Sequence, residues 1–222
     1  MGNLISAEKK DANFGRVRRC KEGQKSKQNV YEAMTLHGKN RYLFGYGIQQ
    51  NMPSIWVLDH LLSSYRPTLI VELGTGMGTL CTYFSVYGMF SDFEVEVISL
   101  DLIKPVMHEE ICNINSPMTT ILDWDIYEND TIDYLTKKIN EAERPFLLSD
   151  GKDPKSDEVN AYSKKLKSGV PIFAHDAILD GKPKFSWGYT EDKIDWNYVK
   201  RYEPYYSWSK EGDTRMMCMI TL

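Results

Sequence analysis

The chain has 222 residues and a mass of 25.7 kDa, a size that suits one α/β domain. It is 42% hydrophobic and 26% charged, which excludes a fibrous chain and one that is disordered over most of its length. The formal net charge of −4 argues against a protein that mainly coats nucleic acid. No uncharged apolar run approaches the roughly 18–20 residues of a membrane span. The four cysteines form no metal-binding or disulfide pattern, which is typical of a protein of the reducing cytosol.

Positive charge is concentrated in the first part of the sequence. Residues 1–30 contain eight Lys or Arg and three acidic residues, a local net charge of +5, which leaves −9 on residues 31–222. We interpret residues 1–30 as a flexible basic arm that precedes a single domain over residues 31–222. The opening Met-Gly-Asn-Leu-Ile-Ser also fits the pattern for myristoylation of Gly2, which together with the basic residues would attach the protein to a membrane. We favour an unmodified arm and a cytoplasmic protein.

From residue 53 onward, hydrophobic patterns predict helices and strands in alternation. Helical patterns cover residues 53–65, 79 to about 87, 129–142 and 156–166, the last of them capped by Ser156. Apolar runs typical of strands in a parallel sheet cover residues 68–73, 95–100, 119–122, 145–149 and 170–174, and a closing strand is expected over 215–222. We therefore predict a doubly wound α/β domain with a mostly parallel sheet and an antiparallel last strand.

An acidic residue lies within a few positions of the end of each predicted parallel strand. In open α/β sheets the ligand lies outside the carboxyl ends of the strands, so these residues would meet at one edge. They are Glu72 with a glycine-rich loop, Asp101, Asp125, Asp150 and the pair His175-Asp176. Five acids placed in this way indicate a binding site.

The glycine-rich loop Gly74-Thr75-Gly76-Met77-Gly78 leads from the first of these strands into a helix. Glycine has no Cβ, so the backbone can turn tightly and approach a ligand closely. The dinucleotide fingerprint G-x-G-x-x-G is not met, because the third glycine comes one residue early. Glu72, two positions before the loop, suits a ligand with an ammonium group, and Asp101 can accept hydrogen bonds from both hydroxyls of a ribose.

These motifs carry a resemblance to a known family. Val71–Gly78, followed by Ile98–Asp101, resembles the first two motifs of class I S-adenosylmethionine-dependent methyltransferases. The segment from Leu147 to Asp176 resembles the branch that contains catechol-type, macrocin-type and cephalosporin-hydroxylase-like O-methyltransferases. The resemblance implies a Rossmann-like methyltransferase fold and the transfer of a methyl group to a hydroxyl of a small-molecule or sugar-like acceptor.

The resemblance also implies which residues bind the methyl donor, S-adenosylmethionine. The residues that would line its methionine part are Glu72, Gly74, Thr75, Gly76 and Gly78. Asp101 would hold the ribose, and Leu102 would lie beside the adenine. Trp124 and Asp125 would flank the adenine ring.

Asp150, His175 and Asp176 are the candidates for chemistry at the acceptor. Asp150 and Asp176 match positions that bind a divalent cation, commonly Mg2+, in metal-dependent relatives, and carboxylates are ligands that Mg2+ prefers. Two departures leave the metal open: Lys152 lies where many relatives have a third polar ligand, and Ala177 replaces an asparagine of the catechol type. His175 suits a general base, although it could also only support a loop by hydrogen bonding.

Three further points stay open at this level. The aromatic residues between Phe185 and Trp208 suit an ordinary core and a contact between copies of the chain, but we favour stacking on the acceptor. An NAD-dependent oxidoreductase would need a different glycine spacing. A module of the same fold could bind the cofactor without turnover, attached to a membrane through residues 1–30.

Overall fold

The computed structural model describes residues 42–43, 46–47, 50, 52–102, 118–151, 154–178, 189–211 and 215–222. The expected basic arm, with Gly2, lies outside these residues, so the arm and the domain boundary at residue 31 stay predictions. Lys152 and Trp187 also lie outside them. In the part of the chain that is described, no helix has both the length and the apolar character that crossing a membrane requires.

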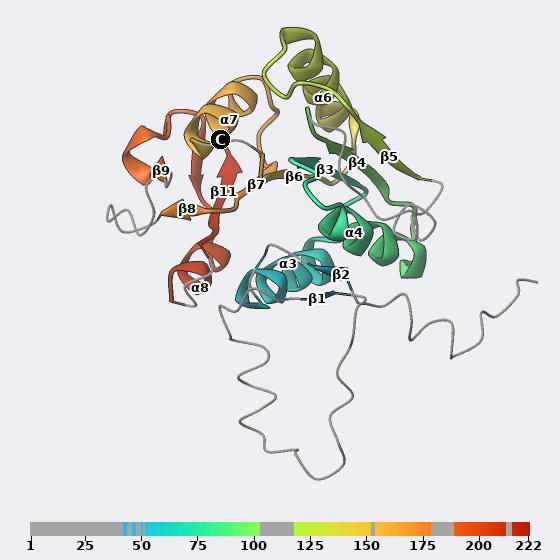
Figure 1. Ribbon diagram of the computed structural model, residues 1–222. Helices are drawn as coiled ribbons and strands as arrows, with labels where there is room; N and C mark the ends of the chain where they lie inside the picture. The colour runs from blue at the N-terminus through green and yellow to red at the C-terminus, as the bar shows by residue number, and fades with distance from the viewer. Residues whose placement is uncertain are drawn as a thin grey trace, which may run out of the picture.

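A seven-stranded sheet forms the centre of the described chain (Figure 1). Its strand order is β10-β11-β7-β6-β3-β4-β5. The parallel strands are β3 (Leu69–Leu73), β4 (Glu96–Leu100), β5 (Thr119–Leu122), β6 (Pro145–Ser149) and β7 (Pro171–Ala174). β11 (Met217–Thr221) runs antiparallel to β7 and to β10 (Val199–Arg201). The predicted mostly parallel sheet with an antiparallel last strand is confirmed.

Helices cover both faces of this sheet. Figure 1 shows α6 (Asn129–Glu141) and α7 (Lys155–Ser163) on one face, and α3 (Met52–Tyr65), α4 (Thr79–Phe90) and α8 (Tyr205–Glu211) on the other. β3, β6 and β7 are buried along their whole length, as their continuous apolar sequences predict. Phe146 of β6 packs edge-on against Phe84 of α4, with 6.3 Å between ring centroids, and so links the sheet to this helix. It also packs edge-on against Phe173 of the neighbouring strand β7 at 5.3 Å.

The strand order positions the site. β4 and β5 lie on one side of β3, while β6 and β7 lie on the other, so the direction of winding reverses beside β3. Helices on opposite faces diverge at such a point and leave a crevice outside the carboxyl ends of the strands. The ends of β3, β4 and β6 carry Glu72, Asp101 and Asp150 to this crevice.

Several short elements differ from the sequence prediction. The helix expected over 156–166 spans Lys155–Ser163 instead, and its N-cap is Pro154 with no side-chain cap. Ser156 therefore does not cap it, and its hydroxyl lies 3.3 Å from the Asp157 carboxylate within the helix. Two-residue strands also pair as β1 (Tyr42–Leu43) with β2 (Tyr46–Gly47) and β8 (Ala177–Ile178) with β9 (Tyr189–Thr190); a 3-10 turn, η1 (Glu191–Lys193), follows.

Candidate functional site

A cavity of about 450 Å3 lies at the carboxyl ends of β3, β4 and β6. The structure brings eight of the residues selected from the sequence into its wall: Glu72, Gly74, Thr75, Gly76, Asp101, Leu102, Asp125 and Asp150. Gly78, Trp124, His175 and Asp176 do not line it. Gln50, Ile126 and Tyr127 do line it, and none of the three was selected from the sequence.

The glycine loop has positive φ angles at its three glycines and contacts two strands. Gly74, Gly76 and Gly78 have φ of 100°, 52° and 77°, a region that disfavours residues with a Cβ. A Cβ on Gly74 would lie 2.4 Å from the carbonyl oxygen of Asp150, so the ends of β3 and β6 touch at this point. The Gly74 and Thr75 amides donate to the Leu100 carbonyl at 2.8 and 3.0 Å, which fixes the loop against β4. Gly78 occupies the N-cap of α4 and turns the chain into that helix.

Glu72 is a buried carboxyl at the base of the cavity, with 1% of its surface exposed. The Ser99 hydroxyl donates to Glu72 Oε2 at 2.5 Å, and the Thr75 and Ser99 hydroxyls are 2.7 Å apart. Burial raises the pKa of Glu72 well above 4.5; the Ser99 hydrogen bond opposes this, and the Asp150 and Asp101 carboxylates add to it. A positively charged group beside Glu72 would oppose this rise in its pKa and stabilise the ionised carboxylate.

Asp101 connects the end of β4 to the glycine loop. The Gly76 amide donates to Asp101 Oδ2 at 2.9 Å, which fixes the carboxylate at the wall of the cavity. Leu102, the next residue, lines the same wall and is two-thirds exposed, so it offers an apolar surface to a ligand. This is the arrangement that a ribose and an attached ring require, with hydroxyl acceptors beside an apolar face.

The segment after β5 lines the far end of the cavity. Asp125, Ile126 and Tyr127 reach it, and the Tyr127 amide donates to Asp125 Oδ1 at 2.9 Å. Trp124 packs edge-on against Tyr134 on α6 instead, with 5.3 Å between ring centroids. The structure does not bring Trp124 into the cavity, because α6 offers its indole an aromatic partner. Nearness to a strand end was the only sequence signal for Tyr127.

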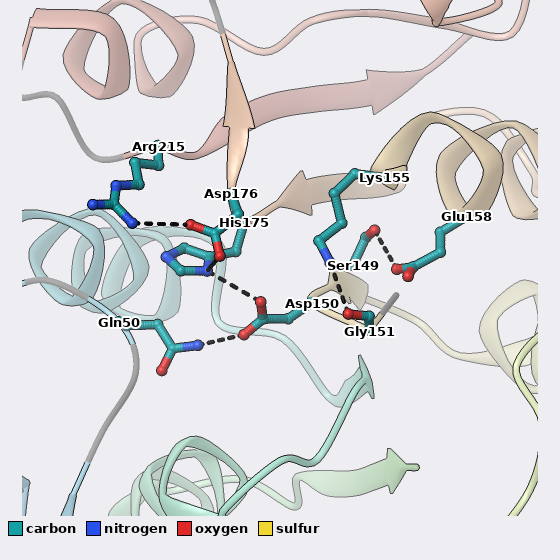
Figure 2. A network of polar contacts seen from close by, with 9 residues as sticks. All are labelled: Gln50, Ser149, Asp150, Gly151, Lys155, Glu158, His175, Asp176 and Arg215. Atoms are coloured by element: carbon teal, nitrogen blue, oxygen red, sulfur yellow. Dashed lines mark hydrogen bonds and ion pairs between the residues drawn. The ribbon is translucent and has the colours of Figure 1, made fainter. Parts of the chain in front are cut away.

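His175, Asp150 and Asp176 form a polar cluster beside the cavity (Figure 2). His175 is 3% exposed, and its Nδ1 lies 3.1 Å from Asp150 Oδ1 and 3.8 Å from Asp176 Oδ2. Burial lowers the pKa of His175, but the Asp150 carboxylate, through charge and hydrogen bond, and Asp176 raise it, so the net pKa lies above 6.5. The two carboxylates stabilise an imidazolium at this position, as a general base requires once it has taken a proton.

Two residues that the sequence did not identify hold these carboxylates. Gln50 Nε2 donates to Asp150 Oδ2, and Arg215 Nη1 lies 3.4 Å from Asp176 Oδ1 (Figure 2). Asp176 and Arg215 have φ of 56° and 57°, although neither is glycine. Strained backbone of this kind concentrates at functional sites. Gln50 is 100 residues from Asp150 in the chain, and no local pattern could have connected them.

A second buried group supports the chain just after Asp150. Ser149 donates to Glu158 Oε2 at 2.6 Å, and Lys155 Nζ donates to the Gly151 carbonyl at 2.8 Å (Figure 2). Burial raises the pKa of Glu158 to about 7, while Lys155 and Ser149 act in the opposite direction. A Cβ on Gly151 would lie 2.7 Å from Ile126 Cδ1 and 2.9 Å from Glu158 Oε1. A side chain at this position would therefore have to displace the ends of the Ile126 and Glu158 side chains.

The aromatic residues of the C-terminal part pack mainly with each other and with α3. Tyr205 and Tyr206 are buried, Phe173 lies 5.6 Å from Tyr205, and Trp208 lies 4.7 Å from His60 between ring centroids. None of the described aromatics of residues 196–208 lines the cavity. The described members of this group therefore pack with each other and with α3, and their contact with an acceptor stays a prediction.

Comparisons with known proteins identify the type of fold and family. A family profile described as rhamnosyl O-methyltransferase/CmcI matches residues 37–221. A CmcI structure with Mg and SAM has 15% sequence identity and a TM-score of 0.60, over 94% of this chain and 89% of that one. A CmcI structure with SAH has 14% identity and a TM-score of 0.57, over 92% and 96%. No match was found among curated proteins. At these identities the structural likeness establishes the fold.

Proposed function

The chain belongs to the rhamnosyl O-methyltransferase/CmcI family, and we propose that it transfers the methyl group of S-adenosylmethionine to a hydroxyl of a small-molecule or sugar-like acceptor. One observation carries the assignment of the site. The glycine loop, Glu72 and Asp101 surround a single cavity whose wall also contains Asp150, the hydrogen-bond partner of His175. A donor bound in this cavity and a proton acceptor at His175 would thus be joined through one carboxylate.

The donor would lie with its amino-acid end at Glu72 and its adenosine toward β5. Burial raises the pKa of Glu72, and the α-ammonium of the donor would oppose this and favour the ionised carboxylate. Asp101 would accept the ribose hydroxyls, with Leu102 and Asp125 beside the adenine. Thr75, Gly76 and Gly78 would support the methionine part through the shape of the loop. Ile126 and Tyr127 join this set because they line the same end of the cavity.

His175 would accept the proton of the acceptor hydroxyl, and Asp150 would orient it. Since Asp150 Oδ1 accepts a hydrogen bond from Nδ1–H, the lone pair of the neutral imidazole lies on Nε2. The acceptor oxygen attacks the methyl carbon, the bond from carbon to sulfur breaks, and S-adenosylhomocysteine leaves. The hydroxyl proton passes to Nε2, and alignment of oxygen, carbon and sulfur supplies much of the acceleration.

The two carboxylates beside His175 are ligands of the kind that a divalent cation prefers. Asp150 and Asp176 both approach His175 Nδ1, and their present partners Gln50, His175 and Arg215 include positively charged or donor groups. The described residues contain no ready cluster of three or more His, Cys, Asp or Glu ligands. With only two carboxylates from the described chain, Asp150 and Asp176 would hold Mg2+ together with oxygens from water and the acceptor. A cation there would lower the pKa of the acceptor hydroxyl.

The remaining assignments concern the setting of the reaction. A small-molecule acceptor follows from the family, and its hydroxylated, sugar-like character is part of the proposal. We place the protein in the cytoplasm, with membrane attachment only if Gly2 is myristoylated. A homo-oligomer would use surface outside the cavity.

The test supplies S-adenosylmethionine labelled in its methyl group and a panel of hydroxylated small molecules, with Mg2+ or with a chelator. The full chain is expected to label at least one acceptor, and the chelator arm reports whether the cation is needed. Asp101→Ala is expected to lower the rate at subsaturating donor. A chain that binds S-adenosylhomocysteine but labels no acceptor would instead be a binding module, against the proposal.

A further inference from the structure

Gln50 is a buried side chain at the wall of the donor cavity. It precedes α3, is 4% exposed, and lines the cavity together with Glu72 and Gly74. Buried amides are normally fully hydrogen-bonded, so both ends of this side chain require a partner. One end has a partner in the protein, and the other does not.

The hydrogen bond to Asp150 fixes the direction of the amide. A carboxylate oxygen only accepts, so the NH2 group of Gln50 must face Asp150 Oδ2 and the carbonyl oxygen Oε1 must face away (Figure 2). Among the described residues no group donates to Oε1. The buried side-chain atoms without a partner in this part of the chain are Glu158 Oε1 and Ser163 Oγ, so Gln50 Oε1 is not sealed inside the protein. It is an acceptor offered to the cavity.

The neighbours of this oxygen define the group that it can bind. Glu72 and Asp150 line the same part of the wall, and Glu72 lies near enough to Asp150 to feel its charge. A ligand group among two carboxyls and a carbonyl oxygen must donate several hydrogen bonds and tolerate negative surroundings. A ligand carboxylate is excluded because the surrounding carboxyl groups would repel its negative charge. A thioether or a sulfonium is excluded because it has no N–H to donate. A primary ammonium meets both requirements.

We propose that Gln50 Oε1 accepts a hydrogen bond from the α-ammonium of the methyl donor, so that one amide links the donor to Asp150. This inference rests on the proposed function. Gln50 is then a donor-binding residue and, through Nε2, a positioning residue for the Asp150 carboxylate that contacts His175. A bound methyl donor would fix the orientation of the Gln50 amide, and the amide would in turn fix the Asp150 carboxylate.

The experiment compares two ligands that differ only at the amino-acid end. S-Adenosylhomocysteine carries the α-ammonium and the α-carboxylate, whereas 5′-methylthioadenosine keeps the adenosine and the thioether but lacks both, and Gln50 Oε1 can accept a hydrogen bond only from the ammonium. Both are titrated calorimetrically into the full chain, Gln50→Met and Gln50→Ala, with Ser63→Ala on the exposed face of α3 as the control. Methionine keeps the length and removes both hydrogen bonds. The ratio of the two affinities within each variant cancels any general loosening of the cavity.

A hydrogen bond to a charged group is worth about 1.5–3 kcal/mol, so both Gln50 variants are expected to bind S-adenosylhomocysteine about 10- to 100-fold more weakly. Their affinity for 5′-methylthioadenosine is expected to stay within about twofold, and Ser63→Ala is expected to match the unchanged chain. Equal weakening of both ligands, or no weakening of either, would overturn the role of Gln50. If the unchanged chain bound neither ligand, the proposed function itself would fail.

Discussion

The two halves of the site are built in different ways. The donor half joins β3 to β4 through contacts between residues 24–27 positions apart, such as Thr75 with Ser99 and Ser99 with Glu72. The acceptor half joins Asp150 to Gln50 across 100 positions and Asp176 to Arg215 across 39. The first half depends on a continuous motif and backbone shape, and the second on polar and charged side chains from separate segments. Asp150 and Gln50 belong to both halves, because they also line the donor cavity, whereas Asp176 and Arg215 do not.

The largest expected effect is in the donor half. Gly74→Ala would place a Cβ 2.4 Å from the Asp150 carbonyl at a φ of 100°, so the ends of β3 and β6 would have to separate. We expect no measurable binding of S-adenosylhomocysteine and a lower melting temperature. Gly169→Ala is the matched control, because its φ is 85° but nothing lies within 4 Å of its Cβ. That change should cost only about 1–2 kcal/mol of stability. Similar behaviour of the two variants would contradict the close contact of β3 with β6.

In the acceptor half, His175→Asn should separate catalysis from donor binding. Removal of a general base lowers turnover by about 10²–10⁴-fold. His175 does not line the cavity, so affinity for S-adenosylhomocysteine should change by no more than about twofold. Methyl transfer and calorimetry are measured on the same preparations, with the exposed His60→Asn as control. Full turnover by His175→Asn would remove the imidazole from the mechanism.

The pH dependence of turnover tests the partner of His175. Its pKa lies above 6.5, so the neutral, proton-accepting form is lost as the pH falls through that pKa, and turnover should fall with it. In Asp150→Asn the carboxylate that raises this pKa is absent, so the fall of turnover at the acidic side of the pH profile should move to lower pH. Turnover is measured from pH 5 to 9 at saturating donor. A fall of turnover that stays at the same pH would mean that Asp150 does not control the protonation of His175.

The smallest expected effect distinguishes two aromatic residues after β5. Tyr127 lines the cavity, whereas Trp124 packs against Tyr134. Contact with an aromatic ring contributes about 0.5–1.5 kcal/mol, so Tyr127→Leu should weaken S-adenosylhomocysteine about 2- to 10-fold. Trp124→Leu should leave its affinity nearly unchanged. The opposite order would return the adenine contact to Trp124, as the sequence suggested.

Features that follow from the local sequence were predicted, whereas features that depend on contacts between distant segments were not. The strand at 145–149 was placed with its observed bounds, because its buried residues form a continuous apolar run. The strand at 119–122 was also placed with its observed bounds, although its sequence is Thr-Thr-Ile-Leu and none of its residues is fully buried. Glu72, Gly74 and Asp101 were found because their positions follow directly from the ends of those strands. β10 and α8, of three and seven residues, were not predicted, because tertiary contacts such as Phe173 with Tyr205 stabilise them. Gln50 and Arg215 reach the site only through folding.

The central claim is that the cavity binds the methyl donor through Asp101 and the glycine loop. Calorimetric titration with S-adenosylhomocysteine, on the full chain and on Asp101→Ala, tests it most directly. We expect micromolar binding, about −8 kcal/mol, by the unchanged chain. Asp101→Ala should bind about 10- to 100-fold more weakly, because it loses both the ribose acceptor and the partner of the Gly76 amide. Equal affinity in the two proteins, or binding of NAD in place of S-adenosylhomocysteine, would contradict the account.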